Sequence, residues 1–256
     1  MSIFNNNLNV PKDMRPSTLD LDASTIEVYI ETAKAISRTT YKSLYVIDYT
    51  TMGFLYVSSN PIFLCGKSSD EVQKQGYDFY AENVPEEDLK FLNEINQAGF
   101  KFLSKIPIEE RLLCTIFYSF HLKTVQQGRT KLSLISHKLT PLRLDEYGNM
   151  HLALCVVSLP ENHNAHISFI TMEGYPTRWE YIRSGKRWKE IPNIILSDDE
   201  KAVIALSQQG MMMQEIATKI NKSIDTVKFY KRGLFQKLGV SNISEAIAYA
   251  THHRLI

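Results

Sequence analysis

The stretch LSDDEKAVIALSQQGMMMQEIATKINKSIDTVKFYKRGLFQKLGVSNISEAIAYA, residues 196–250, decides the fold of the carboxyl-terminal part of the chain. Ser197 and Glu200 form the pattern of a capping box, in which each side chain accepts a hydrogen bond from the other residue's backbone amide. A helix is therefore expected to begin at Asp198. The apolar residues that follow recur at helical spacing, and Gly210 is expected to end this helix in a left-handed conformation.

Three further short helices are predicted after the first. The second covers about 213–220, and the tight turn 221–223 separates it from a third helix at 224–238. Ser223 is a good N-cap for the third helix, and a fourth helix is expected to open at Asn242. A helix, a three-residue turn and another helix form the unit that places its second helix in the DNA major groove.

The third helix has an apolar and a basic side. Val227, Tyr230, Leu234 and Leu238 recur every three or four residues and are expected to face inward. Between residues 222 and 237, five basic side chains stand against one acidic side chain. This density of charge is typical of phosphate binding, but a solvated amphipathic helix can have the same composition. Charge alone leaves both interpretations open.

The spacing of the motifs resembles the LuxR-type helix-turn-helix domain. The family's pattern stands here without an insertion, at Leu196-Ser197, Glu215-Ile216-Ala217, Ser223, Thr226-Val227-Lys228, Lys237-Leu238-Gly239-Val240 and Glu245-Ala246. Three positions depart from it: Met212 replaces a capping Ser or Thr, Tyr230 replaces His, and Gly233 stands inside the third helix. The missing cap and the glycine each lower the stability of their helix by roughly 1 kcal/mol. None of the three departures removes an expected DNA contact.

The resemblance implies double-stranded DNA as a partner and assigns roles to individual residues. Lys228, Phe229 and Arg232 take the positions that enter the major groove. The other expected DNA-binding residues are Lys222, Ser223, Thr226, Lys231 and Lys237. The fourth helix commonly mediates dimerisation in the family, so an exposed stripe for a homodimer is expected at Ala246, Tyr249, Ala250 and His253.

Composition and charge restrict the remaining chain. A length of 256 residues fits one to two domains, and a hydrophobic fraction of 44% is ordinary for a globular protein. Residues 1–190 hold 21 basic and 22 acidic side chains, whereas 191–256 hold 8 and 6, so nucleic-acid affinity is expected only of the smaller region. No apolar run approaches the ~18 residues that span a bilayer, and no signal-peptide core is present. A cytoplasmic protein without a membrane partner is expected.

Residues 43–160 alternate between strand and helix signals. Aromatic and β-branched runs predict five strands, at 43–49, 53–58, 115–122, 130–142 and 150–159. Between the second and third strands stand short helical segments at 60–66 and 71–76, a loop to Val84, and a long helix at 86–103. This order predicts an antiparallel five-stranded sheet with helices packed on one face.

The same order resembles a PAS domain, a fold that bacteria commonly place ahead of an effector as a sensor. The resemblance rests on the YVID run of the first strand, on Ser59-Asn60-Pro61-Ile62-Phe63, on Val84-Pro85-Glu86-Glu87-Asp88-Leu89 and on the Gly148-Asn149 turn. It implies that the long helix and the sheet behind it enclose an apolar pocket for a possible small-molecule ligand. Fold analogy does not name that ligand.

No cofactor, metal or catalytic residue is assigned. His121, His137 and His151 lie on expected strands, where a structural role is commoner than haem ligation. His163 and His166 lack a companion carboxylate or cysteine for a metal site. Cys65, Cys114 and Cys155 have unpatterned spacing and are expected to be buried free thiols. A nucleophile elbow, a phosphate loop and paired carboxylates are all missing, so an enzyme is not expected.

Residues 161–195 contain both tryptophans of the chain, in RWEY at 178–181 and RWK at 187–189. This aromatic segment either docks the sensor on its effector or on a second subunit, or forms an extra strand and loop that cover the sheet edge. The expected organisation is an amino-terminal extension at 1–40 with a helix at 24–37, a PAS-like domain at 41–160, a linker at 161–195 and the helix-turn-helix domain at 196–256.

The sequence as a whole predicts an α+β chain, with a PAS-like antiparallel sheet and helices followed by an all-α four-helix domain. The function it favours is that of a DNA-binding transcriptional regulator controlled by its sensor domain. A ligand-dependent signalling adaptor, whose small domain binds protein, is the alternative. An enzyme hidden in the larger domain is a third possibility.

Overall fold

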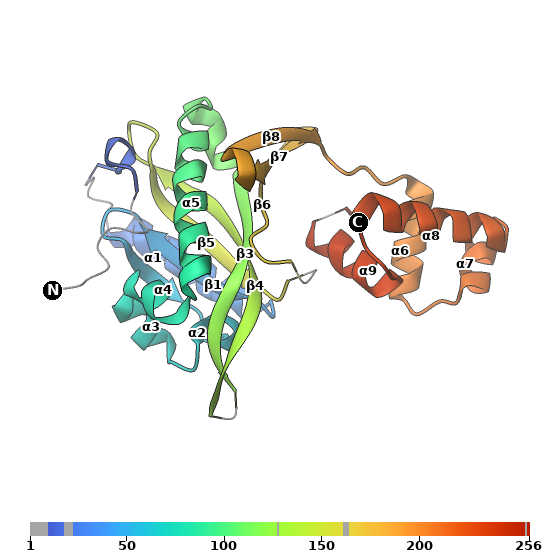
Figure 1. Ribbon diagram of the computed structural model, residues 1–256, viewed down its shortest axis with the longest axis horizontal. Coiled ribbons are helices and arrows are strands. Elements are labelled where there is room, and N and C mark those ends of the chain that lie inside the picture. The colour runs from blue at the N-terminus through green and yellow to red at the C-terminus, as the bar shows by residue number, and fades with distance from the viewer. Residues whose placement is uncertain (1–9, 18–22, 127, 161–163, 254) are drawn as a thin grey trace. The chain divides into compact units, whose positions relative to one another are not determined.

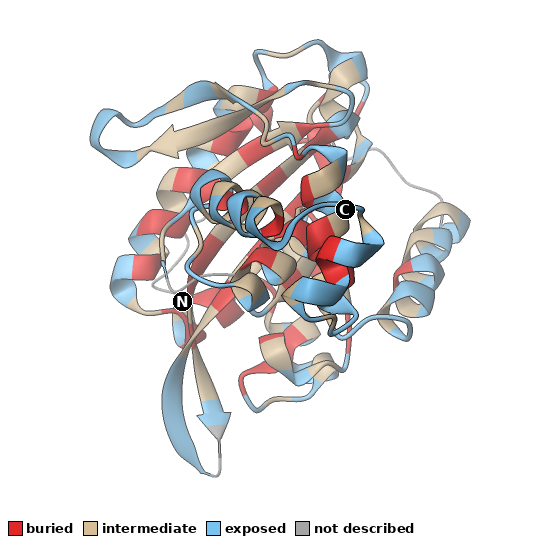
Figure 2. Ribbon diagram, turned by 90° about the vertical axis from the view of Figure 1, so that its right-hand side faces the viewer, coloured by how far each residue is buried: buried red, intermediate tan, exposed pale blue. Residues whose placement is uncertain are grey.

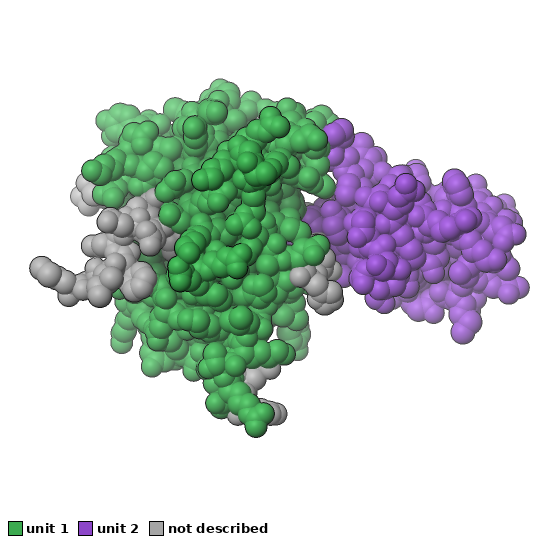
Figure 3. Space-filling view, in the orientation of Figure 1, with its two compact units in different colours: residues 1–191 green, residues 192–256 purple. Residues whose placement is uncertain are grey.

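The computed structural model describes residues 10–17, 23–126, 128–160, 164–253 and 255–256. The chain divides into two compact units, Met1–Ile191 and Pro192–Ile256 (Figure 3). The first is a mixture of strands and helices and the second is helical, so the predicted α+β class is confirmed. Within the described part of the chain, no helix is long and apolar enough to cross a membrane.

The larger unit is an antiparallel sheet with helices packed around it (Figure 1). Its strands are β1 (Ser43–Asp48), β2 (Gly53–Val57), β3 (Cys114–Gln126), β4 (Arg129–Leu144), β5 (Met150–Ser158), β6 (Ser168–Met172), β7 (Thr177–Ile182) and β8 (Arg187–Pro192). Its helices are α1 (Ala23–Ser37), α2 (Pro61–Leu64), α3 (Ser69–Gln75), α4 (Asp78–Asn83) and α5 (Glu86–Leu103), with short 3-10 turns at Lys12–Met14, Ile108–Leu113 and Arg183–Gly185.

The sheet contains the five predicted strands and three more. The strand order in the described residues is β2-β1-β5-β4-β3-β6-β7-β8, so the additional strands continue outward from β3. The expectation of a five-stranded sheet is therefore wrong in number. The physical reason is that β3 would otherwise present an unpaired edge. β6 covers this edge through pairs from Cys114–Met172 to Tyr118–Ser168.

Helices α1 and α2 both contact β1, which is buried along its whole length. Figure 2 shows the buried strands surrounded by more exposed helices. Alternate side chains of a strand point to opposite faces. Tyr45 lies beneath the helices that follow β2, where it stacks on Phe63 of α2 at 4.5 Å between ring centroids. Val46 points the other way, beside Tyr56 of β2. The Tyr56 hydroxyl lies 2.9 Å from the Ser37 hydroxyl of α1, so the predicted amino-terminal helix packs on this opposite face.

The two tryptophans anchor β7 and β8 to α5. The Trp179 ring of β7 lies 5.2 Å from the ring of Phe102, and the Trp188 ring of β8 lies 5.9 Å from it. Trp188 Nε1 also donates a hydrogen bond to the carbonyl oxygen of Ala98 at 3.0 Å. The aromatic segment thus adds strands to the edge of the sheet and packs within the larger unit. This agrees with the interpretation of the sequence as an extra strand and loop that cover the sheet edge.

The smaller unit contains α6 (Asp198–Gln208), α7 (Met213–Lys219), α8 (Ile224–Leu238) and α9 (Ile243–His252). The predicted capping box is present: the Ser197 hydroxyl accepts from the Glu200 amide at 3.3 Å, and the Glu200 carboxylate accepts from the Ser197 amide at 2.8 Å. The helices enclose a core of their own, which includes Val203, Ile216 and Leu234. The predicted helix starts are therefore confirmed by local hydrogen bonds.

Two glycines of this unit differ in whether their positions can accept a side chain. Gly233 does not interrupt α8, and a β-carbon there would meet Glu200 Oε1 at 3.7 Å, an ordinary van der Waals distance. Gly210, which follows α6, has a φ of +82°. L side chains rarely adopt that conformation. The two positions should therefore respond to alanine in opposite ways.

Gly233→Ala should stabilise α8 by about 0.5–1 kcal/mol, because alanine has the higher helix propensity and finds space. Gly210→Ala should destabilise the unit by about 1–3 kcal/mol, because it forces a left-handed alanine. Hydrogen exchange of the α8 amides in the full chain measures both effects. Loss of protection in Gly233→Ala would contradict this account of the helix.

Candidate DNA-binding surface and ligand pocket

The exposed side of α8 carries the residues expected to enter the major groove. Lys228, Phe229 and Arg232 are exposed, whereas Val227 and Leu234 of the same helix are fully buried. Phe229 leaves 65% of its surface in contact with solvent. An apolar ring between two cations suits a base edge with a methyl group better than it suits water. The inward and outward faces of α8 thus agree with the predicted pattern.

The start of α8 offers a second set of polar groups. The Ser223 hydroxyl accepts a hydrogen bond from the Thr226 amide at 3.1 Å and lies 2.9 Å from the Thr226 hydroxyl. Lys222 and Ser223 are exposed beside these first amides. The amino end of a helix carries a partial positive charge and attracts phosphate. The lysine adds a full charge to the same end.

Two of the lysines form weak pairs that DNA phosphate can replace. Lys228 Nζ lies 3.0 Å from Asp225 Oδ1, and both side chains are more than half exposed. Lys222 Nζ lies 3.7 Å from Asp199 Oδ2. Exposed pairs of this kind contribute little to stability. Lys231 is half-buried, with its ammonium 6.0 Å from the centre of the Phe235 ring.

Lys237 is held differently, because its partner is buried. Its Nζ lies 2.7 Å from Glu200 Oε2, and only 7% of the Glu200 side chain is exposed. Burial by itself would raise the pKa of Glu200, but Lys237 and the Ser197 amide and hydroxyl outweigh it and lower that pKa. Removing Lys237 would leave a buried carboxylate without its cation. This lysine therefore stabilises the fold in addition to its expected contact with DNA.

The expected exposed stripe on α9 is wrong for two of its four residues. Ala246 and Ala250 are fully buried in the core, because α9 packs this face against α6 and α8. Tyr249 and His253 are half-buried, with ring centroids 4.1 Å apart. The exposed side of α9 carries Ser244, Ala248 and Thr251 instead.

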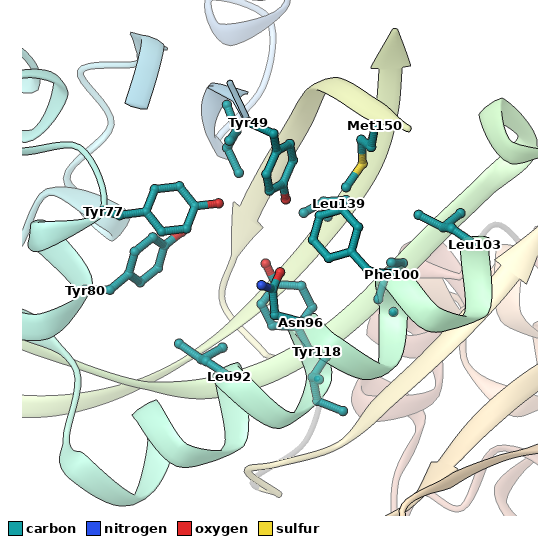
Figure 4. A pocket seen from close by; sticks show the side chains of 14 residues that line it. Tyr49, Tyr77, Tyr80, Leu92, Asn96, Phe100, Leu103, Tyr118, Leu139 and Met150 are labelled. Carbon is teal, nitrogen blue, oxygen red and sulfur yellow. The ribbon is translucent and has the colours of Figure 1, made fainter. Parts of the chain in front are cut away.

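A pocket lies between α5 and the sheet of the larger unit (Figure 4). Apolar side chains of α5, such as Leu92 and Phe100, face Ile47 of β1 and Leu139 of β4 across it. The predicted apolar pocket between the long helix and the sheet is therefore confirmed.

Tyrosines add polar groups to this pocket. The Tyr80 hydroxyl lies 2.5 Å from the Tyr45 hydroxyl, which lies 3.1 Å from His137 Nδ1. Burial lowers the pKa of His137 to about 3, so this imidazole stays neutral. No role for the tyrosines is predicted from the sequence. The features that could have pointed to them are the abundance of tyrosine, 13 in the chain, and the position of Tyr49 at the end of the predicted strand 43–49.

A comparison with protein families matches residues 194–250 to the model described as "Bacterial regulatory proteins, luxR family". This range begins just before α6 and ends within α9. Residues 194–250 form a LuxR-type helix-turn-helix domain. The predicted family resemblance of this region is thereby confirmed. A comparison of the chain with curated proteins finds no match.

Several solved structures are similar to the chain. The response regulator ChrA of a heme-sensing two-component system is 35% identical over 26% of this chain and 33% of ChrA, with a TM-score of 0.25. The chain thus spans about a third of the length of ChrA. Vibrio cholerae VqmA in complex with ligand and DNA is 15% identical over 91% of this chain and 88% of VqmA, with a TM-score of 0.30. The N-terminal domain of a Marinobacter aquaeolei diguanylate cyclase with a PAS/PAC sensor is 14% identical over 46% of this chain and 93% of that domain, with a TM-score of 0.33.

The structure of the LuxR-type domain accommodates the three residues that depart from the family pattern. The Tyr230 hydroxyl donates to Asp199 Oδ2 at 2.6 Å and so ties α8 to α6. Met212 provides no side-chain cap, but its amide donates to the Glu215 carboxylate at 2.7 Å. Gly233 leaves α8 continuous. None of the three displaces the exposed side chains of α8.

The histidines and cysteines outside the LuxR-type domain have structural surroundings. His121 Nδ1 and His166 Nε2 lie 3.2 and 3.1 Å from the buried Asp88 carboxylate, so the expectation that His166 lacks a companion carboxylate is wrong. His163 lies outside the described residues. The three cysteines are buried and free, as predicted, and burial raises the pKa of each thiol to about 12. In the described ranges, no group of three or more His, Cys, Asp or Glu residues could hold a metal ion.

Lys228→Ala and Arg232→Ala should each weaken binding to a specific site by about 1–3 kcal/mol if the side chain contacts a base edge. Fluorescence anisotropy with genomic operator fragments measures the loss. Lys201→Ala is the matched control, because Lys201 is exposed on α6 outside the helix-turn-helix pair. If both α8 variants bound as tightly as the control, the assigned recognition face would be wrong.

Proposed function

We propose that the chain is a transcriptional regulator whose larger unit senses a small molecule and thereby controls DNA binding by the LuxR-type domain. The observation that supports the proposal is that helix α5 contacts both the pocket and the β7–β8 hairpin. One face of this helix lines the pocket through residues such as Ile95 and Gly99. Another face holds the β7–β8 hairpin, from which the chain continues into the LuxR-type domain.

The contacts between α5 and the hairpin are directional as well as apolar. The Tyr181 hydroxyl donates to the Glu94 carboxylate at 2.8 Å, and Trp188 donates to the Ala98 carbonyl oxygen. Glu94, Ala98 and Phe102 are spaced four residues apart and share one side of the helix. A ligand that shifts or rotates α5 therefore acts on the hairpin through specific bonds.

The hairpin leads into the LuxR-type domain within a few residues. β8 ends at Pro192 and α6 begins at Asp198. A short connection passes on a displacement of the strand better than a long flexible linker does. Ligand binding and DNA binding are then coupled thermodynamically, so that each changes the affinity of the other by the same factor.

The structure gives less support to two other functions, a signalling adaptor and an enzyme. A signalling adaptor would present an apolar surface to a protein partner, whereas the exposed side of α8 carries Lys228 and Arg232. An enzyme in the larger unit would need reacting groups, and the described lining of the pocket offers tyrosines and one amide among apolar residues. We propose a sensor that acts without catalysis, in the cytoplasm where bacterial DNA lies.

A substitution that fills the pocket should mimic a ligand and change DNA affinity. Leu139→Phe adds volume at the pocket wall and should alter DNA affinity by about 5–150-fold, the usual range of coupling between sites. Leu122→Phe is the control, because Leu122 is equally buried in the core but does not line the pocket. Anisotropy titrations of the full chain measure both.

Trp188→Ala should weaken the effect of Leu139→Phe, because it removes the hydrogen bond to the Ala98 carbonyl oxygen and the ring contact with Phe102 while the contacts of Trp179 and Tyr181 remain. The change in DNA affinity that Leu139→Phe causes should therefore be smaller in the double variant than in the otherwise wild-type chain. An undiminished effect of Leu139→Phe in the Trp188→Ala background would contradict this route between the two functions. Circular dichroism checks that every variant is folded.

We also propose that two copies bind DNA together. One recognition helix contacts few base pairs, and a specific protein–DNA interface normally needs more area than a single small module provides. A twofold pair would read half-sites about ten base pairs apart or a multiple of that spacing. The exposed residues of α9, Ser244, Ala248 and Thr251, are small enough for a close contact between two copies.

Ala248→Glu should lower DNA affinity, because it would bring like charges together across the twofold axis. Gln208→Glu is the control, since it adds the same charge at an exposed position of α6. Sedimentation of the wild-type complex should give two proteins per operator. One protein per operator at saturation would exclude the dimer.

A further inference from the structure

We propose that the pocket of the larger unit selects an uncharged, flat molecule with hydrogen-bonding atoms on its rim, and that Tyr49, Tyr77 and Asn96 recognise those atoms. This inference rests on the proposed sensor function. It adds the chemical class of the ligand, which the LuxR-type domain does not specify.

Polar groups from three separate elements meet inside the pocket. Tyr49 follows β1, Tyr77 precedes α4, and Asn96 belongs to α5. Figure 4 shows the two hydroxyls and the amide directed toward a common centre. Most of the remaining wall is hydrocarbon, including Leu92, Leu139 and Met150. Among the described residues that line the pocket, Tyr80 and Tyr118 add the other side-chain hydroxyls, so a ligand at this centre can form directional bonds with few side chains.

The lining excludes a charged ligand. Among the described residues that line the pocket, none is Asp, Glu, Lys, Arg or His. Burial raises the pKa of Tyr49 and Tyr77, so these hydroxyls stay protonated and provide no anion. A charge that enters an apolar site without a partner loses its hydration and gains nothing equivalent.

Two buried acids near these elements are already engaged. The Asp48 carboxylate, which precedes Tyr49, accepts hydrogen bonds from the Thr50 amide and hydroxyl at 2.8 and 2.6 Å and from the Thr51 hydroxyl at 3.0 Å. Asp88 of α5 accepts from the His121 amide at 2.8 Å. Neither carboxylate is among the groups that line the pocket.

The shape of the pocket favours a flat molecule. At Gly99, α5 lies so close to β3 that a β-carbon would approach Ile116 Cδ1 to 3.1 Å. The space between the helix and the sheet is therefore narrow at this end. Aromatic rings form part of its wall, and the Tyr49 and Phe100 rings pack edge to face, with their centroids 5.3 Å apart and an angle of 89° between their planes. Planar molecules fill such a slot with favourable ring contacts.

Tyr80 supports the site without being its main polar contact. Its hydroxyl is held at 2.5 Å by Tyr45, which is in turn in contact with His137. This buried chain fixes the Tyr80 ring at the pocket wall. The polar contacts assigned to the ligand are those of Tyr49, Tyr77 and the Asn96 amide.

A set of compounds of one shape tests the charge and polarity of the ligand class. Benzamide is neutral and polar, benzoate is its anionic counterpart, benzamidinium is its cationic counterpart, and toluene has no polar atoms. Ligand-observed NMR with the full chain gives the dissociation constants. Benzamide should bind at least about tenfold more tightly than either ion, and also more tightly than toluene.

Variants assign the binding to the named residues. Tyr77→Phe and Tyr49→Phe should each weaken benzamide by up to about tenfold, the effect of one lost hydrogen bond, and leave toluene unchanged. Tyr147→Phe is the control, because Tyr147 lies in the exposed β4–β5 turn. Equal or tighter binding of benzoate or benzamidinium would overturn the proposal, as would a failure of all four compounds to bind.

The sensor function has a separate readout. If a charged compound bound in the pocket and changed DNA affinity, the sensor function would stand and the proposed ligand class would be wrong. If benzamide bound as expected and the pocket-filling substitution left DNA affinity unchanged, the ligand class would stand and the sensor function would be wrong.

Discussion

The packing of α5 against the sheet is the constraint on which the larger unit depends. Leu92, Ile95 and Leu103 face the core, and Gly99 allows the helix to approach β3 closely. The helix closes the core over the sheet but leaves a pocket toward the tyrosines. Its other side holds both tryptophans of the hairpin through Ala98 and Phe102. One helix therefore sets the shape of the pocket and the position of the last strands.

The LuxR-type domain separates the charges that stabilise it from those available to DNA. Glu200 is buried and paired with Lys237 while it also caps α6, so this pair belongs to the fold. Lys228 and Arg232 lie on the exposed side of α8, and the partner of Lys228 is itself exposed. Buried pairs cost several kcal/mol to break, whereas exposed pairs contribute little. We therefore propose that DNA recruits these exposed cations without opening the domain.

Features fixed by neighbouring residues could be predicted from the sequence. The start of α6 follows from Ser197 and Glu200, and the bounds of α5 follow from its apolar spacing. The exposed side of α8 was predicted for the same reason, since three- and four-residue spacing separates its faces. The packing of the long helix on the sheet was predicted from the order of elements, and the apolar pocket between them was implied by the resemblance of that order to a PAS domain.

Features that depend on distant residues could not be predicted in this way. The segment before Val84 was expected to be a loop, yet α4 forms there because Phe79 and Tyr80 are buried under neighbouring elements. Ala246 and Ala250 were expected on the surface, and only the packing of α9 on α6 shows that they are buried. The tyrosines of the pocket come from three elements whose proximity no local pattern encodes.

The central claim is that the exposed face of α8 binds duplex DNA, and the salt dependence of binding by the full chain tests it most directly. Each phosphate that a lysine or arginine neutralises releases counterions, so the logarithm of the binding constant should fall with the logarithm of salt concentration, by about 0.9 per phosphate contacted. A steep linear decrease between 50 and 200 mM salt, made shallower by about one contact in Lys222→Ala at the phosphate-facing start of α8, is the result that the account predicts. Binding that is insensitive to salt, or a slope identical in the variant, would contradict it and favour the protein-binding adaptor.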